Sequence, residues 1–177
     1  HARTVNTAYE QAGNNTTHLT TADAAGNVVA ATHTIHSPFG SKVTIPGTGM
    51  ILNNTMNIFD PHPGLANSIA PGKRMTSAMS PVIVERDGKP LFATGAVGGL
   101  RIFPAVFQAI INMIDHGMSP QEAVFAPRVW TLGEAVDIEP GIPASIQAEL
   151  AARGHELNPL KIVGAGMGMI HFHDGTM

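Results

Sequence analysis

Short β-rich runs separated by turn sequences predict two β-hairpins in the first half of the chain. Residues 16–21 and 27–35 are β-rich and flank a turn sequence at 23–26, so they predict a hairpin that opens at Thr16. Residues 81–86 and 90–94 flank Asp87-Gly88, a typical two-residue hairpin turn. Between the hairpins, residues 40–80 hold many Gly, Pro and Asn and show little periodicity. They predict a long ordered loop region, and such loops in compact domains tend to be functional.

Helical patterns dominate the second half. An apolar helix is expected over 102–116, and a capping box at 119–122 with proline at the first helical position predicts a short helix to about Ala126. A third helix is expected over 143–153, ended by Gly154, with strands at 136–138 and 167–173. Strands that precede helices predict an α+β fold with antiparallel sheets, not a doubly wound parallel sheet.

Composition narrows the classes of function. Of the 177 residues, 44% are hydrophobic and 13% charged, which indicates a globular chain whose surface is partly covered by another chain or segment. The net charge of −3, with both signs mixed, offers neither a basic stripe for nucleic acid nor a polybasic membrane patch. The absence of cysteine excludes disulfides, thiolate zinc sites and cysteine catalysis. No apolar run reaches transmembrane length.

Thr16, at the head of the first hairpin, is a candidate nucleophile. A threonine hydroxyl needs an adjacent base, and a threonine that begins a chain can use its own α-amino group, with a pKa of roughly 8. Because Thr16 is internal here, that chemistry requires a cut between Asn15 and Thr16. Taken alone, two threonines in a β run are ordinarily explained by β propensity.

An ordered set of motifs resembles the small, catalytic subunit of γ-glutamyltransferases (γ-glutamyltranspeptidases). The resemblance covers nearly all of the chain from Thr16 onward. The motifs that carry it are Thr16-Thr17-His18, Asp23 with Gly26-Asn27, Thr32-His33-Thr34, Phe39-Gly40, Gly49-Met50-Ile51-Leu52-Asn53-Asn54, Lys73-Arg74, Met79-Ser80-Pro81, Asp87-Gly88-Lys89, Thr94-Gly95, Gly98-Gly99, Arg101-Ile102 and Ala126-Pro127-Arg128.

The resemblance implies an N-terminal-nucleophile hydrolase, with an αββα four-layer sandwich and a precursor that cuts itself before the catalytic threonine. The cut would fall at Asn15–Thr16, so that residues 1–15, a polar and turn-rich loop or tail, end the large subunit. Residues 16–177 would be a small subunit that stops short of the family's final strands. The implied partner is the large subunit of the same precursor, the implied location is periplasmic or extracellular, and no cofactor is implied.

Roles follow position by position from the resemblance. Thr16 matches the nucleophile, and its freed amine would act as base and then as acid toward the leaving amine. Thr34 matches the threonine that orients the nucleophile, and Ser77 matches one serine that binds the substrate α-carboxylate. Gly98 and Gly99 match the oxyanion-hole glycines. A Gly-Gly turn before a helix allows backbone N–H groups to approach an oxyanion.

Four positions depart from the family pattern, and all four bear on substrate binding. His36 replaces an asparagine, Thr55 replaces Gln or Glu, Ile58 replaces the acidic residue that holds the substrate α-amino group, and Ala78 replaces the second serine. An ammonium buried against Ile58 would be unpaired and costly. The departures favour an acyl group without an α-amino group, as in cephalosporin-acylase-type relatives, over free glutathione.

Several alternatives stay open at this point. Gly98-Gly99 is also typical of a plain tight turn, Ser77 of a loop hydroxyl and Thr34 of an outward strand position. The pairs His33/His36 and His171/His173 lack a carboxylate or cysteine at metal-ligand spacing, so no metal site is predicted. The function can be an acylase, a true γ-glutamyltransferase whose amino clamp lies on the large subunit, or an uncleaved binding or scaffold domain.

Overall fold

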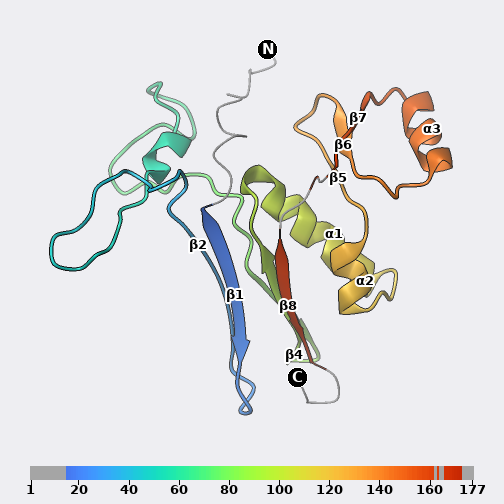
Figure 1. The fold of residues 1–177 in the computed structure, drawn as a ribbon, viewed down its shortest axis with the longest axis horizontal. Coiled ribbons are helices and arrows are strands. Elements are labelled where there is room, and N and C mark those ends of the chain that lie inside the picture. Colours follow the sequence, from blue (N-terminus) through green and yellow to red (C-terminus); the bar gives the residue numbers. More distant parts are fainter. Residues whose placement is uncertain (1–14, 162, 164–165, 173–177) are drawn as a thin grey trace.

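Two β-layers and a helical layer make up most of the fold. The computed structural model describes residues 15–161, 163 and 166–172; the predicted tail before Asn15 and the predicted strand end at His173 lie outside them. The hairpin of β1 (Thr16–Ala22) and β2 (Val28–Thr34) packs against a sheet of β3 (Val82–Arg86), β4 (Lys89–Ala96) and β8 (Met167–His171), in the order β3-β4-β8 (Figure 1). All pairings in these two sheets are antiparallel, as predicted.

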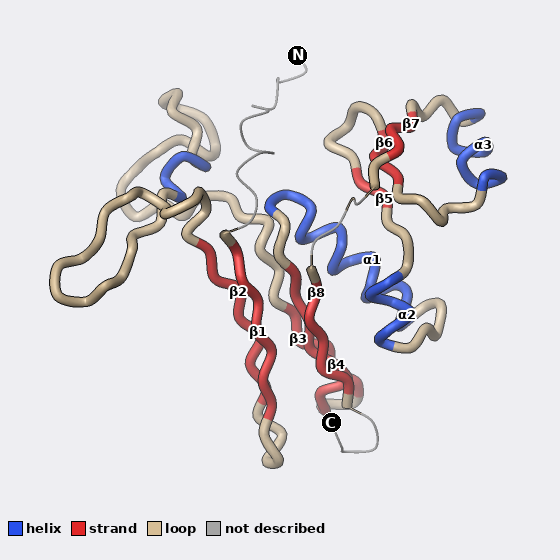
Figure 2. Tube along the Cα trace, viewed as in Figure 1, coloured by secondary structure: helices blue, strands red, loops and turns tan. Residues whose placement is uncertain are grey.

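Helices cover the other face of the three-stranded sheet (Figure 2). Helix α1 (Ile102–Ile114) packs on β4, and α2 (Pro120–Phe125) lies beside α1 and β8. The buried core between helix and sheet contains Ala96, Ile102 and Val106, against which Met79, Val82, Ile110 and Met167 pack. No helix among the described residues is long and apolar enough to cross a membrane.

A small third sheet extends from the helical layer. It contains β5 (Val129–Trp130), β6 (Val136–Ile138) and β7 (Leu157–Pro159), and α3 (Ala144–Ala152) lies between β6 and β7 in the chain. Strands β5 and β6 are antiparallel, whereas β6 and β7 are parallel. This parallel pair departs from the expectation of antiparallel sheets, because a strand that returns through a crossover helix runs in the same direction as the strand before it.

The local sequence signals agree with the observed elements. Ser119 and Glu122 form the predicted capping box at the start of α2, with both reciprocal hydrogen bonds present. The first hairpin has the predicted turn, in which Asp23 Oδ1 accepts hydrogen bonds from the backbone N–H groups of Ala25 and Asn27. The short strand β6 was predicted at 136–138, whereas its neighbours β5 and β7 were not.

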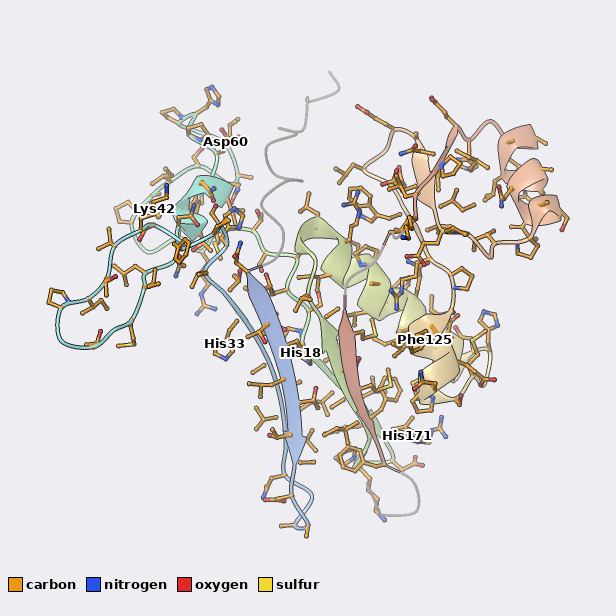
Figure 3. All side chains as sticks on the ribbon, viewed as in Figure 1. His18, His33, Lys42, Asp60, Phe125 and His171 are labelled. Carbon is orange, nitrogen blue, oxygen red and sulfur yellow. The ribbon has the colours of Figure 1, made fainter. Side chains whose placement is uncertain are left out.

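The inner face of the first hairpin carries a histidine among threonines. His18 projects from β1 toward the larger sheet, and its ring nitrogens lie 2.9 Å from the hydroxyls of Thr20 and Thr32 (Figure 3). The ring sits directly over Gly95 of β4, where an added Cβ would lie 2.2 Å from a ring carbon. Glycine at 95 is therefore the residue that lets the two sheets approach with the imidazole between them.

The outer face of the same hairpin is partly apolar and exposed. Leu19 is 44% and Val29 54% exposed, and His33 also lies on this face (Figure 3). A β-hairpin in a two-layer packing ordinarily buries its apolar face and exposes its polar face. This hairpin instead carries polar and apolar side chains on both faces, with Ala22, Val28 and Ala30 on the inner one.

Residues 35–81 connect the two hairpins and follow an irregular path at the end of the sheets where Thr16 lies (Figure 1). The Asn54 side chain holds this segment to Ser37 through both its oxygen and its nitrogen, at 3.0 and 2.9 Å. Gly40, at φ 52°, lies against the backbone of Leu52, where an added Cβ would be 2.2 Å from the carbonyl oxygen. A short 3₁₀ turn, Thr55–Ile58, follows.

Gly95→Ala is expected to lower the free energy of unfolding by about 1–3 kcal/mol, because the new methyl group displaces the hydrogen-bonded His18 ring. Gly168→Ala is the matched control: Gly168 pairs with Gly95 across β4 and β8, but its added Cβ would lie 3.8 Å from the nearest atom of His18. Urea unfolding of the two variants measures the difference. Equal losses would contradict this account of Gly95.

Acidification is expected to destabilise the fold through His18. Burial between the sheets lowers the pKa of His18, because it disfavours the charged imidazolium. The unfolded state therefore binds the proton more readily, so His18 contributes stability above its ordinary pKa of about 6.5 that is lost as the pH falls through the folded value. The free energy of unfolding should fall between pH 7.5 and 5.5, and fall less in His18→Gln. His33→Gln, on the exposed face, should follow the wild-type pH dependence.

Candidate functional site

The hydroxyls of Thr16 and Thr34 meet at the open end of the first hairpin. The antiparallel register places Thr16 directly opposite Thr34, and both side chains point to the inner face. The Thr16 hydroxyl donates a hydrogen bond of 3.0 Å to the Thr34 hydroxyl oxygen. Thr34 therefore faces inward on β2 and not outward.

Thr34 also contacts the peptide bond that precedes Thr16. Its hydroxyl donates to the Asn15 carbonyl oxygen at 3.4 Å, and the backbone N–H of Ile35 donates to the same oxygen at 3.3 Å. Two donors thus lie on the carbonyl of the Asn15–Thr16 bond, while the adjacent hydroxyl of Thr16 is oriented by Thr34. This geometry suits attack by the Thr16 hydroxyl on that carbonyl, with the donors placed where negative charge would develop.

His36 is held at this junction by its backbone. Its N–H donates to the Thr34 hydroxyl at 2.9 Å, and its carbonyl accepts from the Asn15 side-chain amide at 3.2 Å. His36 adopts φ 70°, which is uncommon for a residue other than glycine. Partial burial lowers the pKa of the His36 imidazole, so the ring is predominantly neutral at pH 7.

The Gly98-Gly99 turn joins the end of β4 to α1. Gly98 has φ 139° and Gly99 has φ 63°, values that L side chains rarely adopt, and a 3₁₀ turn, Gly99–Arg101, leads directly into the helix. Arg101, the last residue of this 3₁₀ turn, connects the turn to the third sheet. Its guanidinium donates a hydrogen bond to buried Asp137 at 3.2 Å and lies 4.6 Å from the centroid of the Trp130 ring. The third sheet thereby supports the predicted oxyanion turn.

A cavity with an empty volume of about 360 Å³ opens beside the threonine pair and is called the Thr16 cavity below. Seven of the residues expected at the site line it, together with three apolar residues whose role was not predicted. The expected ones are Thr16, Thr34, His36, Ile58, Ser77, Ala78 and Gly99, and the additional ones are Met75, Met79 and Ile102.

Three expected residues do not line the Thr16 cavity; one of them, Asn15, lines the wider cavity described below. The Thr55 hydroxyl and N–H both bond to the side-chain oxygen of Asn53, which directs Thr55 to the start of the 3₁₀ turn. Gly98 lies one residue before Gly99, which does line the cavity. Met79, one of the additional lining residues, packs on the core cluster and also reaches the cavity.

The lining of the Thr16 cavity is uncharged. Among its described lining residues there is no Asp, Glu, Lys or Arg, and the polar groups are the two threonines, Ser77, His36 and the Gly99 backbone. Ser77 is exposed, and its oxygen accepts a hydrogen bond of 3.1 Å from the N–H of Met79. Ala78, next to Ser77 in the chain, lines the same cavity, so no simple alternation in the sequence marks this wall.

A second, wider cavity lies on the other side of Thr16 and Thr34, with an empty volume of about 1020 Å³. One side of this cavity is the end of the first hairpin. The other side is the loop 44–52, which an antiparallel bridge between Thr44 and Ile51 closes. The apolar residues that this loop contributes to the lining are Ile45, Met50, Ile51 and Leu52. Thr16 therefore stands between two spaces, one small and one broad.

Histidines are separated in the fold. His33 lines the second cavity, whereas His36 lines the Thr16 cavity. Within residues 15–161, 163 and 166–172, no three His, Asp or Glu side chains gather in a way that could hold a metal ion.

Comparison with known proteins places this geometry in a family. The family model described as gamma-glutamyltranspeptidase matches residues 2–176. The chain is 55% identical over 163 residues to the acylase ACY 1 proenzyme of Pseudomonas sp. (strain SE83), covering 92% of this chain but only 29% of that protein. The chain thus spans less than a third of the length of the curated relatives that it matches.

Solved structures share the fold. A mutant of the gamma-glutamyltranspeptidase of Helicobacter pylori aligns with a TM-score of 0.79 and 36% identity, over 88% of this chain and 90% of the aligned chain. The cephalosporin acylase of Bacillus halodurans aligns with a TM-score of 0.79 and 32% identity, over 88% of this chain and 30% of that chain. The described layers are those of this N-terminal-nucleophile hydrolase fold.

Proposed function

Because the chain belongs to the γ-glutamyltranspeptidase family, we propose that it is the catalytic part of an enzyme that transfers an acyl group from an amide through Thr16. The observation that best supports this proposal is the hydrogen bond from the Thr16 hydroxyl to Thr34. It lies beside the contacts that Thr34 and Ile35 make to the Asn15 carbonyl. These contacts bring together Thr16 on β1, Thr34 on β2 and the Asn15 carbonyl, which supports the proposed roles of nucleophile, orienting group and polarised carbonyl.

The first step is self-cleavage at Asn15–Thr16. The Thr16 oxygen attacks the Asn15 carbonyl, the C–N bond breaks, and an ester forms as the nitrogen takes a proton to become the free α-amine. Water then hydrolyses the ester, which leaves a carboxylate on Asn15 and restores the Thr16 hydroxyl. The hydroxyl of Thr34 and the N–H of Ile35 stabilise the oxyanion of the first attack.

The second reaction uses the new chain start. The α-amine of Thr16, with an ordinary pKa of roughly 8, takes the hydroxyl proton as the oxygen attacks the substrate amide. Backbone N–H groups of the Gly98-Gly99 turn stabilise the resulting oxyanion, and the leaving amine departs with the proton from the Thr16 amine. Water or another amine then attacks the acyl-enzyme ester and releases the acyl group.

The Thr16 cavity holds the acyl group in this scheme. Its uncharged lining, with Ile58 and Ala78 at two departures from the family pattern, has no described carboxylate to pair a substrate ammonium. An acyl chain of glutaryl type meets the apolar side chains with its methylenes and meets Ser77 and His36 with its terminal carboxylate. The 55% identity to an acylase proenzyme supports this class of substrate.

The remaining parts of the enzyme come from the same precursor. We assign residues 1–15 to the end of a large subunit and residues 16–177 to a small subunit, in a heterodimer located in the periplasm or outside the cell. The alignment over 90% of a separate chain in the Helicobacter pylori structure supports this division. A γ-glutamyl donor, with an amino clamp on the large subunit, is the second candidate and rests on the family's name. An uncleaved binding or scaffold domain is the alternative outside enzymes.

In the full-length protein, Thr16→Ala is expected to leave one uncut chain, because no other hydroxyl can attack from that position. Thr34→Val keeps the side-chain shape and should slow cutting roughly ten- to a hundredfold, the cost of one charge-assisted hydrogen bond of about 1.5–3 kcal/mol. Intact mass and N-terminal sequencing over time measure both. Thr21→Val, exposed on the outer face of β1, is the control and should cut at the wild-type rate. A wild-type chain that never cuts would support the scaffold alternative.

Substrate preference tests the assignment of the Thr16 cavity. The wild-type enzyme is expected to hydrolyse glutaryl-p-nitroanilide with a higher kcat/KM than γ-glutamyl-p-nitroanilide. Ile58→Asp should shift the ratio toward the γ-glutamyl substrate by about tenfold or more, because a carboxylate then pairs the substrate ammonium. Ile58→Asn, of similar size and uncharged, should shift it much less. Wild-type preference for the γ-glutamyl substrate would favour the second candidate.

A further inference from the structure

The two walls of the Thr16 cavity come from segments that are not paired as strands. Ile58 ends the 3₁₀ turn Thr55–Ile58, whereas Ser77 and Ala78 lie in an extended stretch, residues 73–81, without helix or strand. Both segments line the same cavity. Their separation, and hence the width available to an acyl chain, must be fixed by side-chain contacts.

The Asn67 side chain bridges these two segments. Its Nδ2 donates to the carbonyl oxygen of Ile58 at 2.8 Å and lies 3.4 Å from the hydroxyl of Thr76. Its Oδ1 accepts from the backbone N–H of Thr76 at 3.2 Å. Asn67 thus bonds the backbone of one cavity residue, Ile58, and the backbone next to another, Ser77.

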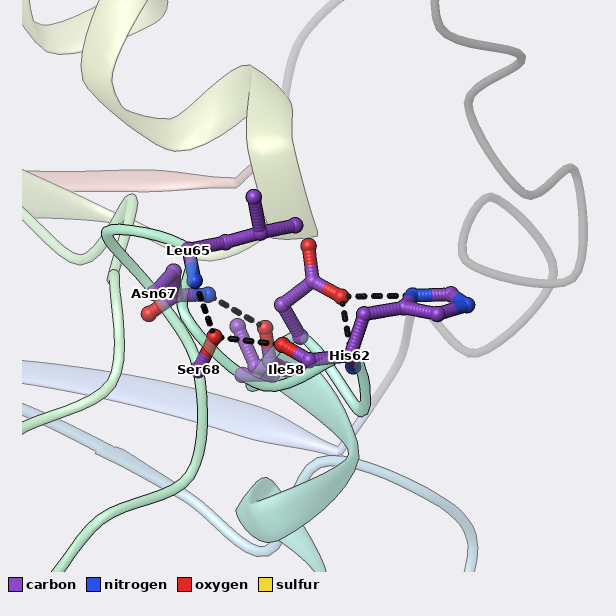
Figure 4. Close-up of polar contacts among 6 residues, drawn as sticks. Ile58, His62, Leu65, Asn67 and Ser68 are labelled. Carbon is purple, nitrogen blue, oxygen red and sulfur yellow. Dashed lines mark hydrogen bonds and ion pairs between the residues drawn. The ribbon is translucent and has the colours of Figure 1, made fainter.

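A polar network centred on buried Asp60 and Ser68 surrounds Asn67 (Figure 4). The Asn67 carbonyl accepts from the N–H of Asp60 at 2.8 Å, and both Asp60 and Ser68 are 5% exposed. One oxygen of Asp60 accepts from the N–H and ring nitrogen of His62 at 3.0 and 2.9 Å, and the Ser68 hydroxyl bonds the His62 carbonyl and the Leu65 N–H. The loop 60–68 is therefore held together by its own side-chain hydrogen bonds around Asp60 and Ser68.

We propose that Asn67 is a positioning residue that sets the width of the Thr16 cavity and so determines which acyl chains fit. This inference rests on the proposed function and deepens it. An amide is the side chain that fits here, because it presents donor and acceptor in one plane. Aspartate could still accept from Thr76 but could not donate to Ile58, and alanine could do neither. The Thr16–Thr34 pair lies on the hairpin and does not depend on Asn67.

The test uses the full-length protein with Asn67→Ala and Asn67→Asp. We expect self-cleavage at the wild-type rate, a KM for glutaryl-p-nitroanilide raised about tenfold and a kcat within about threefold of wild type. The ratio of kcat/KM for adipyl- over glutaryl-p-nitroanilide, which reports on width, should rise at least threefold. Asn67→Asp disturbs the loop less than Asn67→Ala. If Asn67→Ala does not fold, the adipyl-to-glutaryl ratio is measured on Asn67→Asp instead.

Asn27→Ala is the matched control. The Asn27 amide also donates a hydrogen bond, at 2.8 Å to Asp23, but it lies at the tip of the first hairpin, away from the cavity. This variant should keep the wild-type KM and adipyl-to-glutaryl ratio.

Two results would overturn the inference. One is an unchanged adipyl-to-glutaryl ratio in a folded Asn67 variant, and the other is an equal change in Asn27→Ala. A wild-type protein that neither cuts itself nor hydrolyses either anilide would instead remove the proposed function, and the inference with it.

Discussion

The register of the first hairpin is the constraint on which the site depends. Side chains alternate across a strand, so a slip of one residue between β1 and β2 would turn Thr16 or Thr34 to the opposite face. The register is fixed from both ends of the hairpin. The Asp23 turn closes one end, and at the other the His18 ring, bonded to Thr20 and Thr32, fits only over the bare backbone of Gly95. The contact between the sheets thus helps to position the hydroxyls of Thr16 and Thr34, two residues away along each strand.

Elements with strong local signals could be predicted from the sequence. Both large hairpins, the apolar helix over 102–114, the capping box at Ser119 and the glycine turn at 98–99 carry periodicity or turn chemistry of their own. The pairing of β6 with β7 could not be predicted, because a three-residue strand takes its direction from tertiary packing rather than from its sequence.

Most residues of the site could be predicted from the sequence, but the segments that form the walls of the Thr16 cavity could not. Seven expected residues meet at the Thr16 cavity, yet the wall built by Met75 and Met79 and the bridge made by Asn67 were missed. Residues 58–78 are organised by side chain-to-backbone hydrogen bonds and by the buried carboxylate of Asp60. Such contacts depend on three-dimensional position and leave no repeat in the sequence, so Asn67 and Asp60 read there as ordinary loop residues.

The exposed apolar residues on the outer face of the hairpin bear on the order of events in biogenesis. A hairpin with Leu19 and Val29 on its open face needs a covering layer before it meets other chains. When the covering layer belongs to the same polypeptide, the peptide chain that joins the two parts keeps the layer close to the hairpin. Its effective concentration is then near millimolar, far above what two separately synthesised pieces could reach in a cell. The contacts of Thr34 and Ile35 with the Asn15 carbonyl exist only once the hairpin has formed. In the proposed scheme the bond that tethers the two parts is therefore cut only after the tether has served to bring them together.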